Sequence, residues 1–406
     1  MNEATLTFVR QHVNDDVRQL ALRGTRNPDV DMTAALQQIA GRQIARRKLP
    51  LLAAVDGILY PPHLNMEQCS SEQTAQYKGR LCSRLLNETA YQHDAPSSLI
   101  DLTGGFAVDF SWMSKAFDEA TYVERNTELF SITKNNLNLL VPRARCLNAD
   151  GVEVLHEIGH VTMIFLDPAR RDEHGARTYG IADCTPDVLQ LREELLEKAD
   201  FVMLKLSPML DWRKTVEDLG REWVREVHIV ATGGECKELL VVLSRQGEEL
   251  RLTCVNDEDQ YVVGEITGQQ MSVLSPLSDE LLHSSTLHLY EPNAAIMKAG
   301  CFTELETRYG LRQLAQNSHL FVGDRLVTDF PGRKFQVQVV SSMNKRELKE
   351  KVQSLKRANI TVRNFPLTVA ELRKRLKLSE GGSMYIFATT LANGEHVLLL
   401  AQRVGY

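Results

Sequence analysis

Hydrophobic residues in the first part of the chain recur at the three- to four-residue spacing that is typical of helices. The residues that follow this spacing are Phe8, Val9, Val13, Val17 and Leu20, and then Leu36, Ile39 and Ile44. A further helical pattern runs from Tyr77 to Leu86, and Ser70 with Gln73 offers that helix a capping box. The pattern predicts a helical region over residues 1–69 and a helix that leads into the first strand.

From residue 99 onward, short apolar runs alternate with helical patterns. The runs that we interpret as strands are 99–102, 119–123, 145–148, 161–166, 201–206, 227–231 and 239–243. Because helical segments separate the earlier strands, they indicate a parallel sheet. The last two strands are too close for a crossover helix, and Thr232-Gly233-Gly234 makes a hairpin between them, so we expect the sheet to end in an antiparallel strand. Residues 251–255 and 261–263 predict one more hairpin.

A second pattern begins beyond Pro331. It runs strand (335–340), helix (345–357), strand (360–363), helix (368–377) and a strand pair (384–388 and 395–401), which predicts a small α/β module with a mixed sheet. A chain of 406 residues is too long for one ordinary core. We therefore expect four parts: a helical region at 1–69, the main α/β domain at 70–275, a connecting subdomain at 276–330 and the terminal module at 331–406.

The composition is that of a soluble globular protein, with 43% hydrophobic and 25% charged residues. No apolar stretch approaches the roughly 18 residues that span a bilayer, and the amino terminus lacks the basic and apolar regions of a signal peptide. The seven cysteines are scattered without a C-x-x-C pair, as reduced thiols are, which argues against structural zinc. We expect a cytoplasmic protein with no metal and no membrane partner.

Charge is distributed unevenly along the chain. Residues 331–406 hold 14 Lys/Arg and five Glu, a net charge of +9, so the other 330 residues carry −15 of the total of −6. A basic module on an acidic body indicates an enzyme that holds a polyanion beside its catalytic domain. A solvated helix face rich in Lys and Arg is the alternative.

The segments 99–109 and 121–126 carry the first chemical signal. An apolar run ends in Asp101 and the pair Gly104-Gly105, and a second apolar run ends in Glu124, 23 residues after Asp101. Adjacent glycines let a backbone approach a ligand, and an acid near 20 residues on can accept hydrogen bonds from ribose hydroxyls. The G-x-G-x-x-G spacing is absent, and Asp101 and Asp109 would repel a pyrophosphate, which favours a cationic or neutral adenosyl ligand.

These segments, together with Asp150 and Phe165–Arg170, follow one another at predicted strand ends in an order that resembles the class I S-adenosylmethionine-dependent methyltransferases. The run 101–109 with 123–126 looks particularly like the ribosomal-RNA guanine-N2 methyltransferases. The whole chain is similar to bacterial methyltransferases that carry a C-terminal THUMP-like domain. The resemblance implies a Rossmann-like α/β fold with a seven-stranded sheet, and S-adenosylmethionine as cofactor.

The resemblance also implies roles for individual residues. Asp101 would anchor the methionine part of the cofactor, above a loop formed by Thr103, Gly104 and Gly105. Glu124 would hold the ribose hydroxyls, and Asp150 would accept from the adenine amino group. Ala107 departs from the family pattern, which keeps a glycine at this position in many members.

Asp167-Pro168-Ala169-Arg170 lies where amino-group methyltransferases place an acid or amide, two prolines and an aromatic residue. Here Asp167 could accept a hydrogen bond from an exocyclic amine, next to both the cofactor and Pro168. The stacking aromatic is missing, so Tyr179 or Phe106 could replace it, or Arg170 and Arg171 could stack on a base or hold its phosphate. A similar string occurs in uracil-C5 methyltransferases, but Leu206-Ser207-Pro208 offers no nucleophilic cysteine, which disfavours that chemistry.

We expect the partner to be tRNA or rRNA, with no obligate protein partner, and the acceptor to be a base nitrogen, foremost guanine N2. The residues expected to contact RNA are Arg171, Lys345, Arg346, Arg363, Arg373, Lys374 and Arg375.

Two alternatives belong to other functional classes. A noncatalytic RNA-binding or ribosome-assembly factor could keep the methyltransferase fold, and the missing aromatic favours it. His156-Glu157-Ile158-Gly159-His160 matches H-E-x-x-H, the zinc-binding motif of metallopeptidases. Gly159 tends to end a helix, however, and residues 161–166 look like a buried strand, so we expect a short helix with His160 already beyond it.

Overall fold

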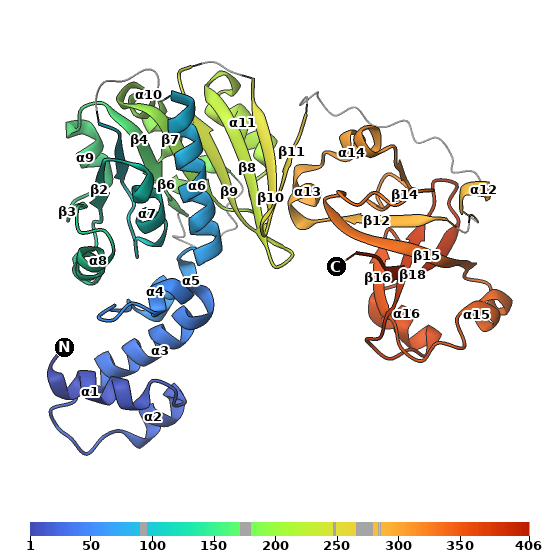
Figure 1. Cartoon of the computed structure of the whole chain (residues 1–406), viewed down its shortest axis with the longest axis horizontal. Helices are drawn as coiled ribbons and strands as arrows, with labels where there is room; N and C mark the ends of the chain where they lie inside the picture. Colours follow the sequence, from blue (N-terminus) through green and yellow to red (C-terminus); the bar gives the residue numbers. More distant parts are fainter. Residues whose placement is uncertain are drawn as a thin grey trace. The chain divides into compact units, whose positions relative to one another are not determined.

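The computed structural model of the chain describes residues 1–89, 96–170, 180–246, 249–264, 279–282, 284 and 286–405 (Figure 1). These residues divide into two compact units, one formed by Met1–Val227 with Glu238–Leu250 and the other by His228–Lys237 with Arg251–Tyr406. Within the described part of the chain, no helix is both long enough and apolar enough to cross a membrane. The predicted domain boundaries at residues 69, 275 and 330 stay predictions.

The first unit opens with helices, as the hydrophobic spacing predicts. They are α1 (Glu3–His12), α2 (Val17–Arg23), α3 (Met32–Lys48), α4 (Pro50–Ala53), α5 (His63–Gln68) and α6 (Glu72–Thr89). The apolar spacing of residues 8–20 is shared by two helices, because Asp16 caps α2 by accepting from the N–H of Gln19. Val9, Leu20 and Ile39 pack in a small core between these helices.

Helix α6 is long and amphipathic, but its predicted cap is wrong. Ser71 caps it instead of Ser70, since the Thr74 N–H donates to the Ser71 hydroxyl at 3.2 Å. The Ser70 hydroxyl donates to Asp109 Oδ2 at 2.7 Å. Figure 1 shows that α6 runs along the sheet of the first unit, and that α1 to α5 lie near the amino-terminal end of α6.

The main sheet has the Rossmann-like α/β organisation that the sequence predicts. Its strands are β1 (Ser98–Asp101), β2 (Glu119–Val123), β3 (Arg145–Leu147), β4 (Val161–Leu166), β7 (Ala199–Leu206), β8 (Val224–Thr232), β9 (Glu235–Leu243), β10 (Arg251–Asn256) and β11 (Asp259–Val262). They lie in the order β11-β10-β8-β9-β7-β4-β1-β2-β3. The pairs among β3, β2, β1, β4 and β7 are parallel, and β9 runs antiparallel to β7. Parallel strands place their carboxyl ends at one edge, where ligands of such sheets bind.

The predicted antiparallel strand is present as β9, but its predicted place at the end of the sheet is wrong. Strand β9 lies between β7 and β8, and the hairpin β10–β11 extends the sheet to nine strands among the described residues, where seven were expected. Residues 239–243 are buried at every position, so this strand is covered on both faces and is typical of a sheet interior. The turn at Gly233-Gly234 is present as predicted, with both glycines in the left-handed region.

Helices connect the strands of this sheet. They are α7 (Val108–Met113), α8 (Thr127–Leu140), α9 (Gly151–Glu157), α10 (Val188–Lys198) and α11 (Trp212–Leu219), and a two-stranded ribbon of β5 (Ala169–Arg170) and β6 (Cys184–Thr185) follows β4. Helix α6 packs against α7. Both helices therefore stand next to the loop that follows β1.

The second unit is built on a mixed sheet, as predicted for the terminal module. Its strands are β12 (His288–Pro292), β13 (Arg312–Gln313), β14 (Phe321–Gly323), β15 (Gly332–Ser342), β16 (Asn359–Arg363), β17 (Met384–Thr390) and β18 (His396–Arg403). They lie in the order β13-β14-β12-β15-β18-β17-β16, with β16 and β17 parallel and β17 and β18 antiparallel. Segments on both sides of residue 331 therefore share one sheet.

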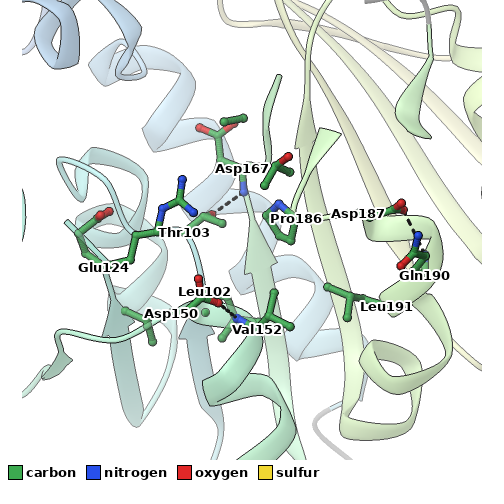
Figure 2. A pocket seen from close by; sticks show the side chains of 15 residues that line it. Leu102, Thr103, Glu124, Asp150, Val152, Asp167, Pro186, Asp187, Gln190 and Leu191 are labelled. Atoms are coloured by element: carbon green, nitrogen blue, oxygen red, sulfur yellow. Dashed lines mark hydrogen bonds between the residues drawn. The ribbon is translucent and has the colours of Figure 1, made fainter. Parts of the chain in front are cut away.

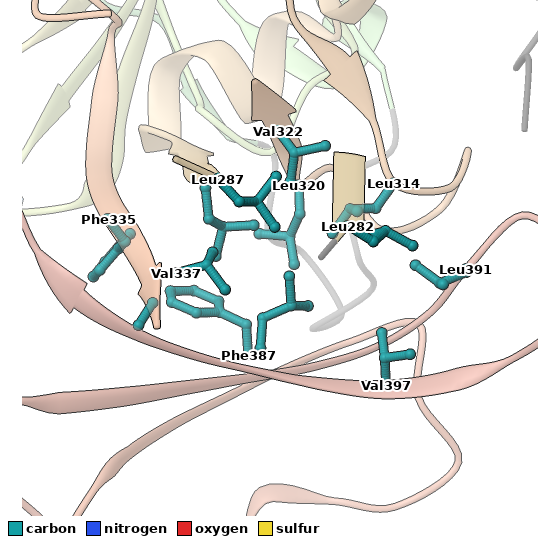
Figure 3. Packing of buried hydrophobic residues seen from close by; sticks show 13 residues of the cluster. Leu282, Leu287, Leu314, Leu320, Val322, Phe335, Val337, Phe387, Leu391 and Val397 are labelled. Atoms are coloured by element: carbon teal, nitrogen blue, oxygen red, sulfur yellow. The ribbon is translucent and has the colours of Figure 1, made fainter. Parts of the chain in front are cut away.

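The faces of the second sheet carry separate apolar cores. One gathers Leu289, Leu320, Phe335, Phe387 and Leu399 (Figure 3). The other face is covered by the helices of the terminal module, α15 (Lys345–Lys351) and α16 (Val369–Leu376). The remaining helices are α12 (Asp279–Leu282), α13 (Ala294–Ala299) and α14 (Phe302–Tyr309).

Helix α15 is shorter than the predicted 345–357. The N–H groups of Val352 and Gln353 both donate to the Leu348 carbonyl, at 3.0 and 3.1 Å, so the regular four-residue spacing of the hydrogen bonds ends at Val352. Val352 is buried in the core beneath the helix. Burial of this side chain draws the chain out of the helical path.

Candidate functional site

A pocket of about 360 Å³ lies at the carboxyl ends of β1, β2 and β4 (Figure 2). Its lining residues are Leu102, Thr103, Val123, Glu124, Arg125, Asp150, Gly151, Val152, Asp167, Ala169, Thr185, Pro186, Asp187, Gln190 and Leu191. The volume falls in the range of small-molecule and cofactor sites, roughly 300–1,000 Å³. The lining combines carboxylates with the apolar surfaces of Val152, Pro186 and Leu191, which suits a ligand that has hydroxyl or amino groups and a flat ring.

The loop after β1 is fixed by hydrogen bonds to its neighbours. The Thr103 N–H donates to Asp101 Oδ1 at 3.0 Å, and the Gly104 N–H donates to the Val123 carbonyl at 2.8 Å. The hydroxyls of Tyr122 and Thr133 both donate to the Gly105 carbonyl, at 2.6 and 3.1 Å. The backbone of this loop is thus held against β2 and α8 by hydrogen bonds within the protein.

Glycine is required at two places around the pocket. A Cβ on Gly104 would lie 2.0 Å from Cε2 of Tyr122, and one on Gly151 would lie 2.1 Å from the Leu102 carbonyl oxygen. Gly105 adopts a positive φ of 54°. Ala107 also adopts a positive φ, 57°, so this alanine takes a left-handed conformation that favours glycine.

Glu124 and Asp150 both line the pocket, and both carboxylates also hold the backbone. Glu124 accepts from the N–H groups of Gly105 and Asn126, at 2.9 and 2.7 Å. Asp150 caps α9 by accepting from the Val152 N–H at 2.8 Å. A carboxylate has about four acceptor positions, so each of them can also accept from a ligand hydroxyl or amino group.

Asp101 lies at the end of β1 beneath the pocket, outside its lining, and is only 2% exposed. Burial raises the pKa of this carboxyl to about 8, and the nearby carboxylates of Asp109 and Asp167 add to the increase, although the Thr103 N–H opposes it. A cationic group placed near Asp101 would favour its ionised form.

Asp167 follows β4, at the rim of the pocket. Its N–H donates to the Thr103 hydroxyl at 2.6 Å, and its side chain is 42% exposed. The ammonium group of Lys205 forms an ion pair with Asp167 Oδ2 and lies 3.5 Å from Asp109 Oδ2. Strands β4 and β7 pair in register at Leu166 and Leu204, so the next residues along, Asp167 and Lys205, are brought face to face.

The charged residues behind Asp167 were not predicted from the sequence. Lys78 in α6 is fully buried, lies 3.1 Å from Asp109 Oδ1 and donates to both oxygens of Glu238, at 2.5 and 2.6 Å. The signal was present in the pattern: Lys78 falls on the apolar face of a helix, Lys205 interrupts the apolar run 201–206, and Glu238 directly precedes a buried strand. A charged side chain that is buried in a protein is normally paired with an opposite charge.

Comparison with known proteins agrees with this geometry. A family model described as a ferredoxin-like domain matches residues 288–331, and one described as THUMP domain-like matches residues 332–403. An uncharacterized S-adenosylmethionine-dependent methyltransferase of Mycobacterium tuberculosis (strain CDC 1551 / Oshkosh) is 25% identical over 270 residues, which are 65% of this chain and 69% of that protein. The crystal structure of a protein from Porphyromonas gingivalis W83, described as a methyltransferase, is 32% identical with a TM-score of 0.84, and the match covers 99% of this chain and 98% of that one.

The chain belongs to the class I S-adenosylmethionine-dependent methyltransferases with a C-terminal THUMP-like domain. The cofactor of this family is S-adenosylmethionine, as the loop after β1 and the acids at the strand ends had indicated. The pocket of this methyltransferase fits that cofactor by its volume, its glycine-dependent loop and the carboxylates at its edge.

The metallopeptidase motif does not form in this methyltransferase. Helix α9 ends at Glu157 and Ile158 is extended, so His156 and His160 do not share a helix face. His156 Nδ1 lies 2.9 Å from Glu194, and His160 Nε2 lies 3.6 Å from Asp200. Over the described ranges, no group of three or more His, Cys, Asp or Glu side chains is placed to hold a metal ion.

Of the residues considered as replacements for the missing aromatic, Phe106 is the one whose side chain the structure describes. Phe106 is buried in a core with Tyr60 and Val108 and lines a separate apolar pocket, so its proposed role as the stacking ring is wrong. Arg171, Tyr179 and the side chain of Arg170 lie outside the described residues. Pro168 is buried next to Asp167.

The basic residues of the terminal module fall into two groups. Lys345 and Arg346 in α15, and Lys374 and Arg375 in α16, are exposed. Arg363 instead lies 3.2 Å from the buried Glu291, and Arg373 donates to the Ala358 carbonyl at 3.2 Å, so these two side chains already have partners within the second unit.

Proposed function

We propose that this methyltransferase transfers a methyl group from S-adenosylmethionine to a base nitrogen in structured RNA, either tRNA or rRNA, with the N2 amine of guanine as the preferred acceptor. The observation that carries the proposal is the Asp167–Lys205 pair at the rim of the pocket. Lys205 contacts one carboxylate oxygen of Asp167 and leaves the other toward the pocket. Carboxylate oxygens accept hydrogen bonds, and an exocyclic amine is a matching donor.

In this proposal the adenosyl part of the cofactor occupies the pocket lined by Glu124 and Asp150. Glu124 accepts from the ribose hydroxyls, Asp150 accepts from the adenine amino group, and Asp101 faces the methionine part across the loop of Thr103, Gly104 and Gly105. When bound, the cofactor supplies an electrophilic methyl group on a sulfonium. The protein binds the reactants and aligns them in a site shielded from water, which supplies much of the acceleration in such a reaction.

Asp167 and Pro168 then orient the acceptor. The amine donates one hydrogen to Asp167, so that its lone pair is directed at the methyl group, and Arg170 contacts the base or its phosphate. As the nitrogen–methyl bond forms, the methyl–sulfur bond breaks and its electron pair stays on sulfur. Asp167 accepts the proton that the methylated nitrogen loses and passes it to water. A base inside a helix must first be flipped out to reach this position.

RNA is the proposed partner because of the charge of the terminal module. Residues 331–406 carry +9 on a chain with a total charge of −6, and the exposed Lys345, Arg346, Lys374 and Arg375 lie on its two helices. We also keep Arg171, Arg363 and Arg373 as RNA contacts. All seven cysteines are free thiols, which agrees with a cytoplasmic location.

The test combines cofactor binding with methyl transfer. Calorimetric titration of S-adenosylmethionine should show binding by the wild type and by Asp167→Ala, and loss of binding in Asp101→Ala and Glu124→Ala. Glu193→Ala, an exposed carboxylate on α10, is the matched control. No binding by the wild type would contradict the cofactor site.

The second measurement is transfer of labelled methyl groups to RNA from a strain that lacks the gene, followed by nucleoside analysis. The expected product is N2-methylguanosine, and Asp167→Ala should abolish it. Binding of the RNA without any transfer would instead favour the noncatalytic RNA-binding factor.

A further inference from the structure

Five charged side chains form an alternating series that begins at the pocket and runs into the interior of the first unit. The order is Asp167, Lys205, Asp109, Lys78 and Glu238, with each ion-pair contact at 3.5 Å or less. These residues come from the loop after β4, from β7, α7, α6 and β9. Five segments far apart in the sequence therefore each contribute one charge to this series.

Four of these five side chains are buried or nearly so, and Asp167 is the exception. The side chains of Lys78, Glu238, Asp109 and Lys205 are 0, 3, 10 and 13% exposed, whereas Asp167 is 42% exposed and lines the pocket. Buried ion pairs contribute little net stability compared with apolar side chains of the same size. A buried series that ends at one accessible carboxylate is better explained by what it does to that carboxylate.

The buried part of the series limits the positions that the Lys205 ammonium group can adopt. Its ammonium group lies between Asp167 and Asp109, and Asp109 is itself held by Lys78 and by the hydroxyl of Ser70 at 2.7 Å. Asp109 lies in the first turn of α7, directly after the loop that follows β1 and contains Gly104 and Gly105. Lys205 is therefore fixed relative to the loop that carries the cofactor.

We propose that Lys205 is a positioning residue for methyl transfer. It clamps Oδ2 of Asp167 and leaves Oδ1 to accept the hydrogen of the substrate amine. Within the described residues Oδ1 of Asp167 has no hydrogen-bond donor, in agreement with this division of the two oxygens. The inference rests on the proposed function, because it assigns Asp167 to an amine acceptor.

The test uses a double-mutant cycle on the full chain. The variants are Lys205→Met, Asp167→Asn and the double variant, with Lys205→Arg to keep the charge and Lys214→Met as the control, since Lys214 forms only an exposed pair with Asp218. Lys205 does not line the pocket. Lys205→Met should therefore bind S-adenosylmethionine within about threefold of the wild type, whereas kcat for methyl transfer to RNA should fall about 100-fold, the order expected for a misplaced reacting group.

Two further readouts separate positioning from a structural role. The KM for RNA should stay unchanged in Lys205→Met, and in the Asp167→Asn background the same substitution should lower kcat no further. Lys205→Arg should recover part of the lost kcat, because it restores the cation beside Asp167. An equal loss of kcat in both backgrounds, or a loss of cofactor affinity as large as the loss of kcat, would overturn the proposal.

A failure of the proposed function gives a different result. If the wild type transfers no methyl group to RNA, that function fails, and the clamp is then judged from melting temperatures. Coupled residues should lower the melting temperature less in the double variant than the two single shifts add up to. Additive shifts would refute the clamp whatever the acceptor is.

Discussion

Gly104→Ala tests whether contact with Tyr122 determines the conformation of the loop that follows β1. The new Cβ would lie 2.0 Å from Cε2, 2.4 Å from Cδ2 and 2.8 Å from Cζ of that ring. Carbon atoms in contact are normally about 3.5–4.0 Å apart, so the overlap is about 1.5 Å. The ring cannot yield easily, since Tyr122 is fully buried beside Phe110, 5.7 Å between ring centroids, and Phe130, 6.4 Å. The loop itself must move.

The expected cost follows from the size of that overlap. Inserting one carbon into a packed interior destabilises a protein by roughly 1–3 kcal/mol, and a loop displaced by about 1 Å should weaken cofactor binding about 100-fold, by analogy with misplaced catalytic groups. Movement of the loop also lengthens the 2.6 Å hydrogen bond from the Tyr122 hydroxyl to the Gly105 carbonyl. Urea denaturation and calorimetric titration of S-adenosylmethionine measure the two effects separately.

Gly159→Ala is the matched control. A Cβ at Gly159 meets no atom within 4 Å, so the same substitution there should leave both stability and cofactor affinity unchanged. If Gly104→Ala has the urea midpoint of the wild type and binds S-adenosylmethionine with an affinity within threefold of it, the contact with Tyr122 does not determine the conformation of the loop.

The remaining predictions concern charge. Lys78→Met should cost about 3–5 kcal/mol in urea denaturation, because it removes the buried cation that pairs with Glu238 and one of the two cations beside Asp109; adding Glu238→Gln should recover part of the loss, and an additive cost would contradict the pairing. Because the folded pKa of Asp101 is raised to about 8 from an unfolded value near 4, the folded state holds the extra proton, so stability falls as pH rises from about 4 to 8. Asp101→Asn should therefore be more stable than the wild type at pH 9 and equal to it near pH 3, and a constant difference would refute the assignment. Cofactor affinity should rise between pH 7 and 9 in the wild type as Asp101 ionises, a trend that calorimetry should not find in Asp101→Asn. Lys374→Ala and Arg375→Ala should each reduce the slope of log K against log salt for RNA binding by about one, and unchanged slopes would remove α16 from the RNA interface; Lys214→Ala is the control.

Much of the fold could be predicted because its strands are continuous apolar runs. The runs at 99–102, 119–123 and 161–166 appear as β1, β2 and β4 within one residue of the expected bounds. The strand order could not be predicted, because hydrogen-bond partners are chosen by packing in three dimensions. The place of β9 between β7 and β8, and of β10–β11 beyond β8, is of this kind.

Local rules failed where a side chain had a better partner elsewhere. Ser70 fits a capping box by its spacing, but it bonds Asp109, 39 residues away, and Ser71 takes the cap. Phe106 is one of the residues offered as a replacement for the missing stacking aromatic, but it packs in the core beneath the N-terminal helices. Spacing along the chain cannot register such distant partners.

The sequence by itself determined the chemistry of the strand ends in this methyltransferase. Asp101, Glu124, Asp150 and Asp167 stand at the ends of successive apolar runs, and parallel strands must place such ends at one edge. Only the tertiary structure decided which cations meet these acids. Lys205 reaches Asp167 because β4 and β7 are neighbours in register, and Lys78 reaches Asp109 because α6 packs on α7. The physical reason is that burial of a charge depends on a partner supplied by another segment, whereas the position of a strand end depends only on its own residues.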